Sequence, residues 1–268
     1  MQPMRWTFDK VKRQSVINRL TPGPDAGPLP REIVQTEGNG KFTAEGKVLP
    51  FPGNTFICHI DRQSEFFDRL CRFQDAFKRL PLADRFSFLP RESFHMTIFC
   101  GVSGNPLGID GWPDDLPRDA GLEAVNAAFV DKLGKASGED GFSVRASGLE
   151  LPATIAMEPD TRLDELKLRC IRAKLQELTG IVRGDIFDYA FHVSMAYPIR
   201  WLTRAEAELI MSEAEALFAE HLSELGPIAL GPPEFCAFNT MYRFDTIGQL
   251  AAGGYRRFSG EPGRYGDS

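Results

Sequence analysis

The spacing of apolar and polar residues divides the chain, from about residue 51 onward, into strands and amphipathic helices. Short runs of aromatic and aliphatic residues bounded by turn residues are typical of strands. Apolar residues three and four positions apart are typical of helices. This spacing predicts strands at 54–61, 86–89, 93–100, 142–151, 154–157, 190–197 and within 234–247. It predicts helices at 64–80, 122–133, 163–178 and 205–217.

Capping residues agree with these helices. A hydroxyl or carboxylate just before a helix accepts a hydrogen bond from an N–H of its first turn, and an acidic residue three positions later completes a capping box. Glycine is favoured just after a helix ends. The candidate N-caps are Ser64, Asp119, Thr161 (with Asp164) and Thr203 (with Glu206), and Gly180 is the candidate stop.

Residues 1–50 lack a sustained period, and we interpret them as an N-terminal extension. Segments 21–24 and 27–30 are rich in proline and glycine, which indicates turns and loops. Apolar residues between Trp6 and Leu20 are available to pack against the body of the protein, which we assign to 51–268. We therefore expect irregular, partly ordered structure that wraps the fold.

Two stretches, Ser93–Cys100 and Ala190–Tyr197, repeat one pattern: a histidine, an apolar residue, a small hydroxyl residue and another apolar residue. A single strand histidine is commonly a hydrogen-bonded, half-buried residue with no catalytic role. The chain has only 4 histidines, so two copies of the pattern are unexpected by chance and favour a shared function.

The parity of a strand predicts how each motif is presented. Successive side chains point to opposite faces, so His95 shares a face with Thr97, and His192 shares a face with Ser194. The other face of each strand is apolar and suited to a core. Each strand therefore presents an imidazole beside a hydroxyl.

Paired His-apolar-Thr/Ser-apolar strands resemble the two-histidine phosphoesterases. That superfamily includes RNA 2′,3′-cyclic phosphodiesterases, 2′-5′ RNA ligase-like proteins and a bacterial branch of unassigned function. The resemblance implies an α+β fold that is bilobal and duplicated, with two antiparallel sheets flanked by helices around a central cleft. The order of the predicted elements fits this arrangement. The resemblance also implies that His95 and His192 are catalytic, and that Thr97 and Ser194 bind the substrate phosphate.

Two facing imidazoles suit hydrolysis of a phosphodiester without a metal or another cofactor. Histidine titrates near pH 6.5, so one ring can take a proton from water while the other gives one to the departing oxygen. The motif hydroxyls can donate hydrogen bonds to the non-bridging phosphate oxygens. The sequence does not say which histidine is the base.

Further candidates for substrate contact follow the second motif or lie in the last strands: Tyr197, Arg200, Tyr242 and Arg243. Arg200 could hold a phosphate as a forked donor. Tyr197 lies on the apolar parity of its strand, so it is equally suited to packing. We interpret His59 as structural or supporting, because Asp61 stands where a motif would have its hydroxyl.

Composition narrows the partners and the compartment. The net charge of −6 favours a small nucleotide or a short RNA end over a long nucleic acid. The five cysteines are widely spaced and form no Cys-x-x-Cys pair, which predicts reduced thiols, with Cys58 and Cys100 packed in the core. No segment has the apolar length of a membrane span or the apolar region of a signal peptide. We therefore expect a cytoplasmic protein with no membrane partner.

Other functions are compatible with parts of the sequence. The two histidines with Asp110, Asp185 or Asp188 could bind zinc, but the usual ligand spacings are missing and the motif hydroxyls would have no role. A Ser-His-Asp hydrolase is disfavoured, because the sequence lacks Gly-x-Ser-x-Gly. The alternative that stays open is a non-catalytic module that binds a nucleotide or phosphate on the same fold.

Overall fold

The computed structural model describes residues 10–35 and 39–258 as an α+β protein, which confirms the predicted class. Its helices are α1 (Lys10–Leu20), α2 (Glu65–Phe77), α3 (Leu122–Leu133), α4 (Arg162–Thr179) and α5 (Arg204–His221), with short 3-10 turns η1 (Ala83–Arg85) and η2 (Arg91–Ser93). Its strands are β1 (Ile33–Val34), β2 (Phe42–Thr43), β3 (Gly53–His59), β4 (Phe86–Phe88), β5 (His95–Ser103), β6 (Phe142–Leu151), β7 (Thr154–Pro159), β8 (His192–Ser194), β9 (Ala196–Pro198), β10 (Ile228–Leu230), β11 (Glu234–Thr240), β12 (Arg243–Ala251) and β13 (Gly254–Arg257). None of the helices in the described part of the chain has the length and apolar character of a membrane span.

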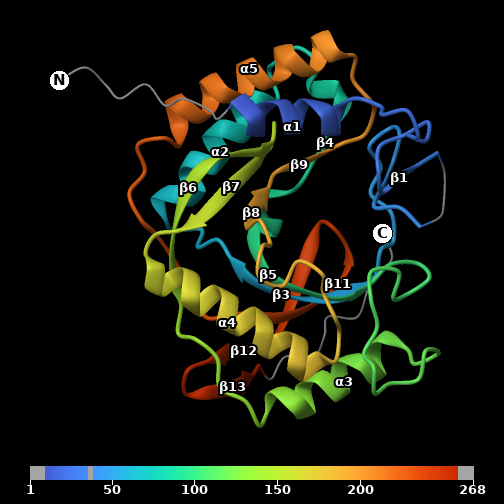
Figure 1. Ribbon diagram of the computed structural model, residues 1–268, viewed down its shortest axis with the longest axis vertical. Coiled ribbons are helices and arrows are strands. Elements are labelled where there is room, and N and C mark those ends of the chain that lie inside the picture. The colour runs from blue at the N-terminus through green and yellow to red at the C-terminus, as the bar shows by residue number, and fades with distance from the viewer. Residues whose placement is uncertain (1–9, 36–38, 259–268) are drawn as a thin grey trace.

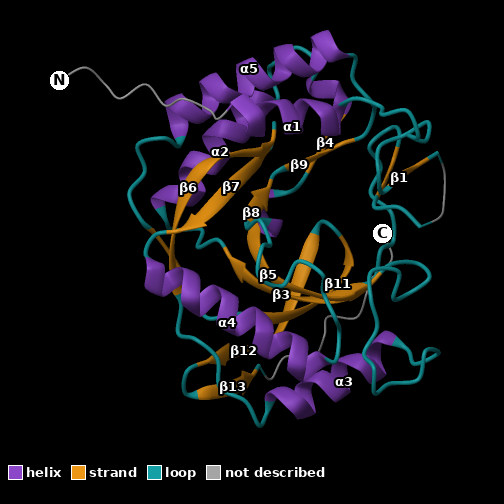
Figure 2. Ribbon diagram, viewed as in Figure 1, coloured by secondary structure: helices purple, strands orange, loops and turns teal. Residues whose placement is uncertain are grey.

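A nine-stranded antiparallel sheet, in the order β10-β6-β7-β8-β5-β3-β11-β12-β13, forms the centre of the protein. Two small sheets lie apart from it: the parallel pair β1-β2 and the antiparallel pair β4-β9. In the view of Figure 1, α1, α2 and α5 lie at one end of the molecule and α3 and α4 at the other, with strands between them. Figure 2 shows the same separation of helices and strands by colour.

The sheet is continuous, whereas the sequence analysis expects two sheets. The two halves, β10-β6-β7-β8 and β5-β3-β11-β12-β13, meet at a single pair of residues, Met96 in β5 and Val193 in β8. The short strand β8 pairs with β7 at three positions but with β5 at this one. The duplicated, two-lobed arrangement stays a prediction.

The helices form where the apolar spacing and the caps predict them. Ser64, Thr161 and Thr203 accept hydrogen bonds from N–H groups in the first turns of α2, α4 and α5, and Thr203 forms a full capping box. Gly180 ends α4 with a φ of 67°, a left-handed conformation that glycine adopts at little cost. The N-cap of α3 is Gly121, so the prediction of Asp119 is wrong.

Residues 10–20 form a helix, whereas the sequence analysis expects irregular structure. In Figure 1, α1 lies alongside α5, and the Arg13 Nε atom is 2.8 Å from the Glu215 carboxylate. Val16, Ile17 and Leu20 are buried in the common core. The helix is stabilised by this packing rather than by its own period, since its apolar face is one turn long. Trp6 lies outside the described residues.

Candidate active site

The two sequence motifs lie on neighbouring strands of the central sheet. Met96 pairs with Val193 in antiparallel register, and both side chains are fully buried. The residues on either side of each therefore point to the opposite face of the sheet. The four side chains on that face are His95, Thr97, His192 and Ser194, all of them partly exposed.

The register also fixes which of these side chains are neighbours. In an antiparallel ladder, the pairing of Met96 with Val193 sets His95 across from Ser194 and Thr97 across from His192. Each imidazole thus has a motif hydroxyl on its own strand and another on the neighbouring strand.

Both imidazoles are held in the same way. The Nδ1 atom of His95 is 2.6 Å from the Ser93 carbonyl oxygen, and the Nδ1 atom of His192 is 2.8 Å from the Ala190 carbonyl oxygen. A carbonyl oxygen only accepts, so each Nδ1 carries a proton and donates it. In the neutral ring Nε2 is then the basic atom. No described residue is hydrogen-bonded to Nε2 of either ring.

The surroundings of both rings favour the neutral form. The pKa of His95 is lowered to about 4, mainly by burial and in part by the nearby His59 and His192, while the hydrogen bond to the Ser93 carbonyl opposes the change. Burial also lowers the pKa of His192, against the opposing effects of the Ala190 carbonyl and the Glu150 carboxylate. Both rings are therefore mainly neutral at pH 7 when no ligand is bound.

A third histidine, His59, lies directly across from His95 on the neighbouring strand β3. The centroids of the two rings are 6.5 Å apart. The Nδ1 atom of His59 donates to Oε2 of Glu234 at 3.0 Å, and the Thr246 hydroxyl donates to the same oxygen at 2.6 Å. Burial would raise the pKa of Glu234, but these hydrogen bonds outweigh burial and hold the pKa below its ordinary value. The pairing of His59 with Glu234 escapes sequence analysis, because 175 residues separate the two.

A β-bulge changes the face on which Cys100 lies. Thr97 pairs with Ile57 and Phe99 pairs with Phe56, so Ile98 is an extra residue in β5. The extra residue reverses the alternation, and Cys100 is exposed. The prediction that Cys100 packs in the core is therefore wrong, while Cys58 is buried as predicted. Burial of the sulfur raises the pKa of the Cys100 thiol, and the nearby Arg183 opposes this effect.

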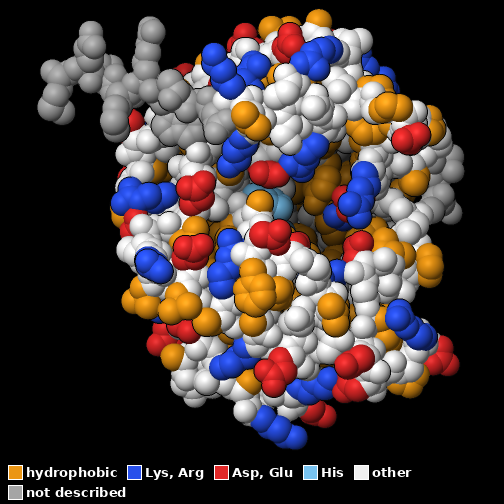
Figure 3. All heavy atoms as spheres, in the orientation of Figure 1, with side chains coloured by type: hydrophobic (Ala, Val, Ile, Leu, Met, Phe, Trp, Pro, Cys, Tyr) orange, Lys and Arg blue, Asp and Glu red, His pale blue; other side chains and the backbone are white. Residues whose placement is uncertain are grey.

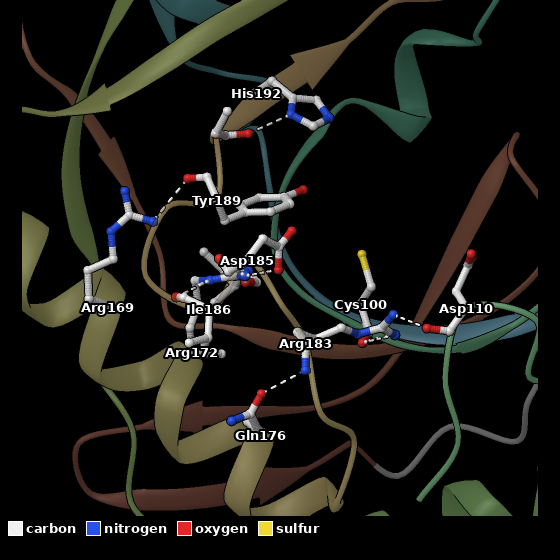
Figure 4. Close-up of polar contacts among 12 residues, drawn as sticks. Cys100, Asp110, Arg169, Arg172, Gln176, Arg183, Asp185, Ile186, Tyr189 and His192 are labelled. Atoms are coloured by element: carbon white, nitrogen blue, oxygen red, sulfur yellow. Dashed lines mark hydrogen bonds and ion pairs between the residues drawn. The ribbon is translucent and has the colours of Figure 1, made fainter. Parts of the chain in front are cut away.

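Two arginines bond the edge of β5 beyond the end of β8. Nη1 of Arg172 donates to the Ile98 carbonyl at 2.6 Å. Nη2 of Arg183 donates to the Cys100 carbonyl at 2.7 Å (Figure 4) and to the Gly101 carbonyl at 2.6 Å. These carbonyls extend past the single pair that joins β5 to β8. These two guanidinium groups thus donate the hydrogen bonds that a neighbouring strand would otherwise donate to β5. Arg172 belongs to α4, and Arg183 belongs to the segment that leads to His192 (Figure 4).

The predicted substrate-contact residues lie in two different places. Tyr197 and Tyr242 pack against the ring of Phe42, at centroid distances of 5.2 and 6.1 Å. Nε of Arg200 donates to the Ala44 carbonyl at 3.4 Å, so Arg200 also contacts the N-terminal segment. Arg243 is exposed and lines a separate pocket with His59.

Lys41 is a candidate residue that the sequence analysis missed. Its Nζ atom is 2.9 Å from the Glu32 carboxylate and 5.2 Å from the centroid of the Tyr197 ring. Burial would lower the pKa of Lys41, but Tyr197 and Glu32 reverse the effect and raise it. The charge of Lys41 also lowers the pKa of His192. No pattern in the sequence indicates that Lys41 lies near His192, because Lys41 belongs to the N-terminal extension, which lacks a sustained period.

Among the described residues, one group has the separations of a metal site: His59, Glu234 and Cys236, whose ligand atoms lie within 4.8 Å of one another. Cys236 is buried, and its Sγ atom is 3.6 Å from the Thr246 hydroxyl. The zinc ligands considered from the sequence are not part of this group. Asp185 instead forms an ion pair with Arg172 at 3.0 Å, and Asp110 accepts a hydrogen bond from Ser103.

The surface is hollowed in the middle of the face seen in Figure 3, and a histidine side chain is visible at the edge of this hollow. Lysine, arginine and acidic side chains surround the opening, and apolar side chains line part of its wall. Such a hollow suits a small ligand with both a charged and an apolar part.

Comparisons with known proteins agree with these observations. Residues 41–154 match the family model 2H-phosphodiest, described as a domain of unknown function (DUF1868), and this range includes His95 and Thr97. The crystal structure of a conserved protein of unknown function from Agrobacterium tumefaciens str. C58 is similar, with a TM-score of 0.70 and 27% identity over 80% of this chain and 94% of that chain. A crystal structure titled phosphoesterase aligns with a TM-score of 0.35 and 9% identity over 78% of this chain and 94% of that chain. No curated protein matches the sequence.

Proposed function

We propose that this chain, which belongs to the two-histidine phosphodiesterase family through residues 41–154, is a phosphoric diester hydrolase. Its substrate would be a cyclic phosphate or phosphodiester of a nucleotide or a short RNA end. The observation that carries the proposal is the matched state of the two imidazoles. Each Nδ1 donates to a carbonyl two residues earlier, which leaves Nε2 of His95 and of His192 available beside the motif hydroxyls.

We assign His95 as the base and His192 as the acid. The pKa of His95, lowered to about 4, keeps this ring neutral at the pH of catalysis. The pKa of His192 is also lowered, but a phosphodiester anion bound beside the ring would favour the imidazolium form. The nearby Glu150 carboxylate acts in the same direction.

The reaction then follows from these two states. Nε2 of His95 takes a proton from water as the water oxygen forms a bond to phosphorus. The bond from phosphorus to the leaving oxygen breaks, and that oxygen receives the proton from Nε2 of His192. The sum is the addition of one water across a P–O bond. Thr97 and Ser194 would donate to the non-bridging oxygens, where negative charge is held.

The substrate is proposed to be small. The net charge of −6 disfavours the long basic surface that a nucleic-acid polymer needs. A nucleotide or a short RNA end requires cations at one or two positions, and Lys41 lies within electrostatic reach of His192.

The test is a turnover assay of the full chain, with EDTA present, on the four 2′,3′-cyclic nucleotides and a short RNA with a cyclic end. We expect turnover that falls by about 10²–10⁴-fold in His95→Ala and in His192→Ala. His221→Ala, at the end of α5, removes a distant histidine and is the matched control. Near wild-type rates in either motif variant would refute the mechanism. Tight nucleotide binding without turnover would favour the binding-module alternative, and turnover only with added metal would favour the metal chemistry.

A further inference from the structure

A second pocket lies next to His95, on the side away from His192. It has a volume of about 470 Å³ and is lined by His59, Ile60, Arg62, Arg91, Glu92, Arg243 and Phe244. Two of its residues contact or neighbour His95. Phe244 packs edge-on against the His95 ring with centroids 4.3 Å apart, and His59 lies across from His95 on β3. Since β8 and β3 flank β5 on opposite sides, His192 and this pocket are on opposite sides of His95.

The pocket is dominated by guanidinium groups. Three arginines line it, against one carboxylate, Glu92. They come from three separate parts of the chain: Arg62 from the loop after β3, Arg91 from η2, and Arg243 from the first position of β12. Their convergence is therefore a product of the fold and is not one run of basic residues.

These arginines keep donors free for a ligand. Nη2 of Arg91 donates to Asp75 at 2.6 Å, and Nε of Arg243 donates to Asp245 at 2.6 Å. A guanidinium has five N–H donors, so each of these pairs leaves other donors unused. Arg62 is exposed and has no hydrogen bond or ion pair with another described residue. Planar guanidinium forks match the oxygens of a phosphate group, which can accept two hydrogen bonds from one arginine.

We propose that this pocket is an anion subsite, which binds a second phosphate group of the substrate beyond His95. The position of the scissile phosphate between His95 and His192 rests on the proposed function. Neighbouring strands are ~5 Å apart, so a group in the pocket would lie ~5–10 Å from the scissile phosphorus. The substrate class is then a nucleotide that carries a further phosphate near the one hydrolysed.

A binding experiment tests the subsite without relying on turnover. Calorimetry compares a nucleoside 3′,5′-bisphosphate with the 3′-monophosphate of the same nucleoside, on the wild-type protein and on the double variant R62Q/R243Q. We expect the wild type to bind the bisphosphate about tenfold more tightly, and the variant to lose that preference. The variant R256Q/R257Q removes the same charge from exposed positions in β13 and is expected to keep the preference.

A matched turnover experiment uses a nucleoside 2′,3′-cyclic phosphate with and without a 5′-phosphate. The measured quantity is the ratio of the two kcat/KM values, in which a general loss of activity cancels. We expect a ratio of about 10 in the wild type and about 1 in R62Q/R243Q. The subsite would be overturned if the wild type showed equal affinities or equal kcat/KM values for the two probes, or bound neither probe. It would also be overturned if R62Q/R243Q kept the preference. Turnover without any preference overturns the subsite alone, whereas a bisphosphate preference without turnover overturns the hydrolase alone.

Discussion

Replacement of Arg172 by methionine is the most informative perturbation of the region between the two motifs. The Arg172 side chain is 1% exposed, and its guanidinium is hydrogen-bonded to three backbone carbonyls. One of these is the carbonyl of Ile98, the extra residue of the bulge in β5. The other two belong to Asp185 and Ile186, which precede the second motif. Methionine has a comparable length and no donor.

The magnitude follows from what the variant leaves behind. Ile98 and Ile186 are buried, and a buried carbonyl without a donor costs about 1–3 kcal/mol. The loss is partly offset, because a buried charge carries its own desolvation cost. Burial lowers the pKa of Arg172, which is the sign of that cost. We expect a net loss of about 3 kcal/mol in the free energy of unfolding. At about 2–4 °C per kcal/mol, Tm falls by about 6–12 °C.

The assay is urea unfolding followed by circular dichroism, with Tm from calorimetry. Arg169→Met is the matched control, since Arg169 lies one turn earlier in α4 and donates to the carbonyl of Tyr189 at 3.0 Å. Arg169 is only half-buried, so we expect a loss of about 1 kcal/mol. If Arg172→Met were no more destabilised than Arg169→Met at unchanged m-value, the guanidinium would not be what holds the β5 edge.

Three further predictions concern pH and helix capping. If His95 is the base and His192 the acid, kcat/KM should be highest between pH 4 and 6.5 and should fall above that range. The reason is that the pKa values of both rings lie below 6.5 in the free protein. A value of kcat/KM that rises up to pH 8 would contradict the assignment. The pKa of His95 is about 4 when folded and 6.5 when unfolded, so its contribution to stability is complete above pH 6.5 and is lost as pH falls to 4. Urea unfolding should therefore show wild type losing about 2–3 kcal/mol more than His95→Gln over that interval, and parallel pH profiles would argue against a buried neutral ring. Thr203→Ala removes the capping box of α5 and should cost about 1 kcal/mol, with Ser223→Ala, beyond the same helix, as a control expected to cost less.

The parts of the site that obey strand alternation could be read from the sequence. His95 and Thr97 share a face because no irregularity separates them, and the same holds for His192 and Ser194. The parity fails at Cys100, because the bulge at Ile98 depends on pairing with β3 and leaves no mark in the local sequence.

Contacts between distant parts of the chain could not be derived in this way. Lys41 approaches His192 only because residues 41–44 pack against Tyr197 and Tyr242. The apolar face of α1 is too short for its period to be detected in the sequence. The helix forms because α5 supplies the surface that stabilises it. Helices α2, α4 and α5 are the reverse case, because their own caps and apolar spacing specify them.

The single pair of Met96 and Val193 also determines how the spacing of the two imidazoles is maintained. A long ladder would fix that spacing by many backbone hydrogen bonds, each repeating the same geometry. Here a single pair joins the two strands. Beyond it, Arg172 of α4 and Arg183 of the following segment are hydrogen-bonded to the backbone carbonyls of β5. The distance between the two imidazole rings therefore depends on residues that contact neither ring. Substitution of Arg172 or Arg183 by a side chain of different length would change that distance, and with it the size of substrate that the site accepts.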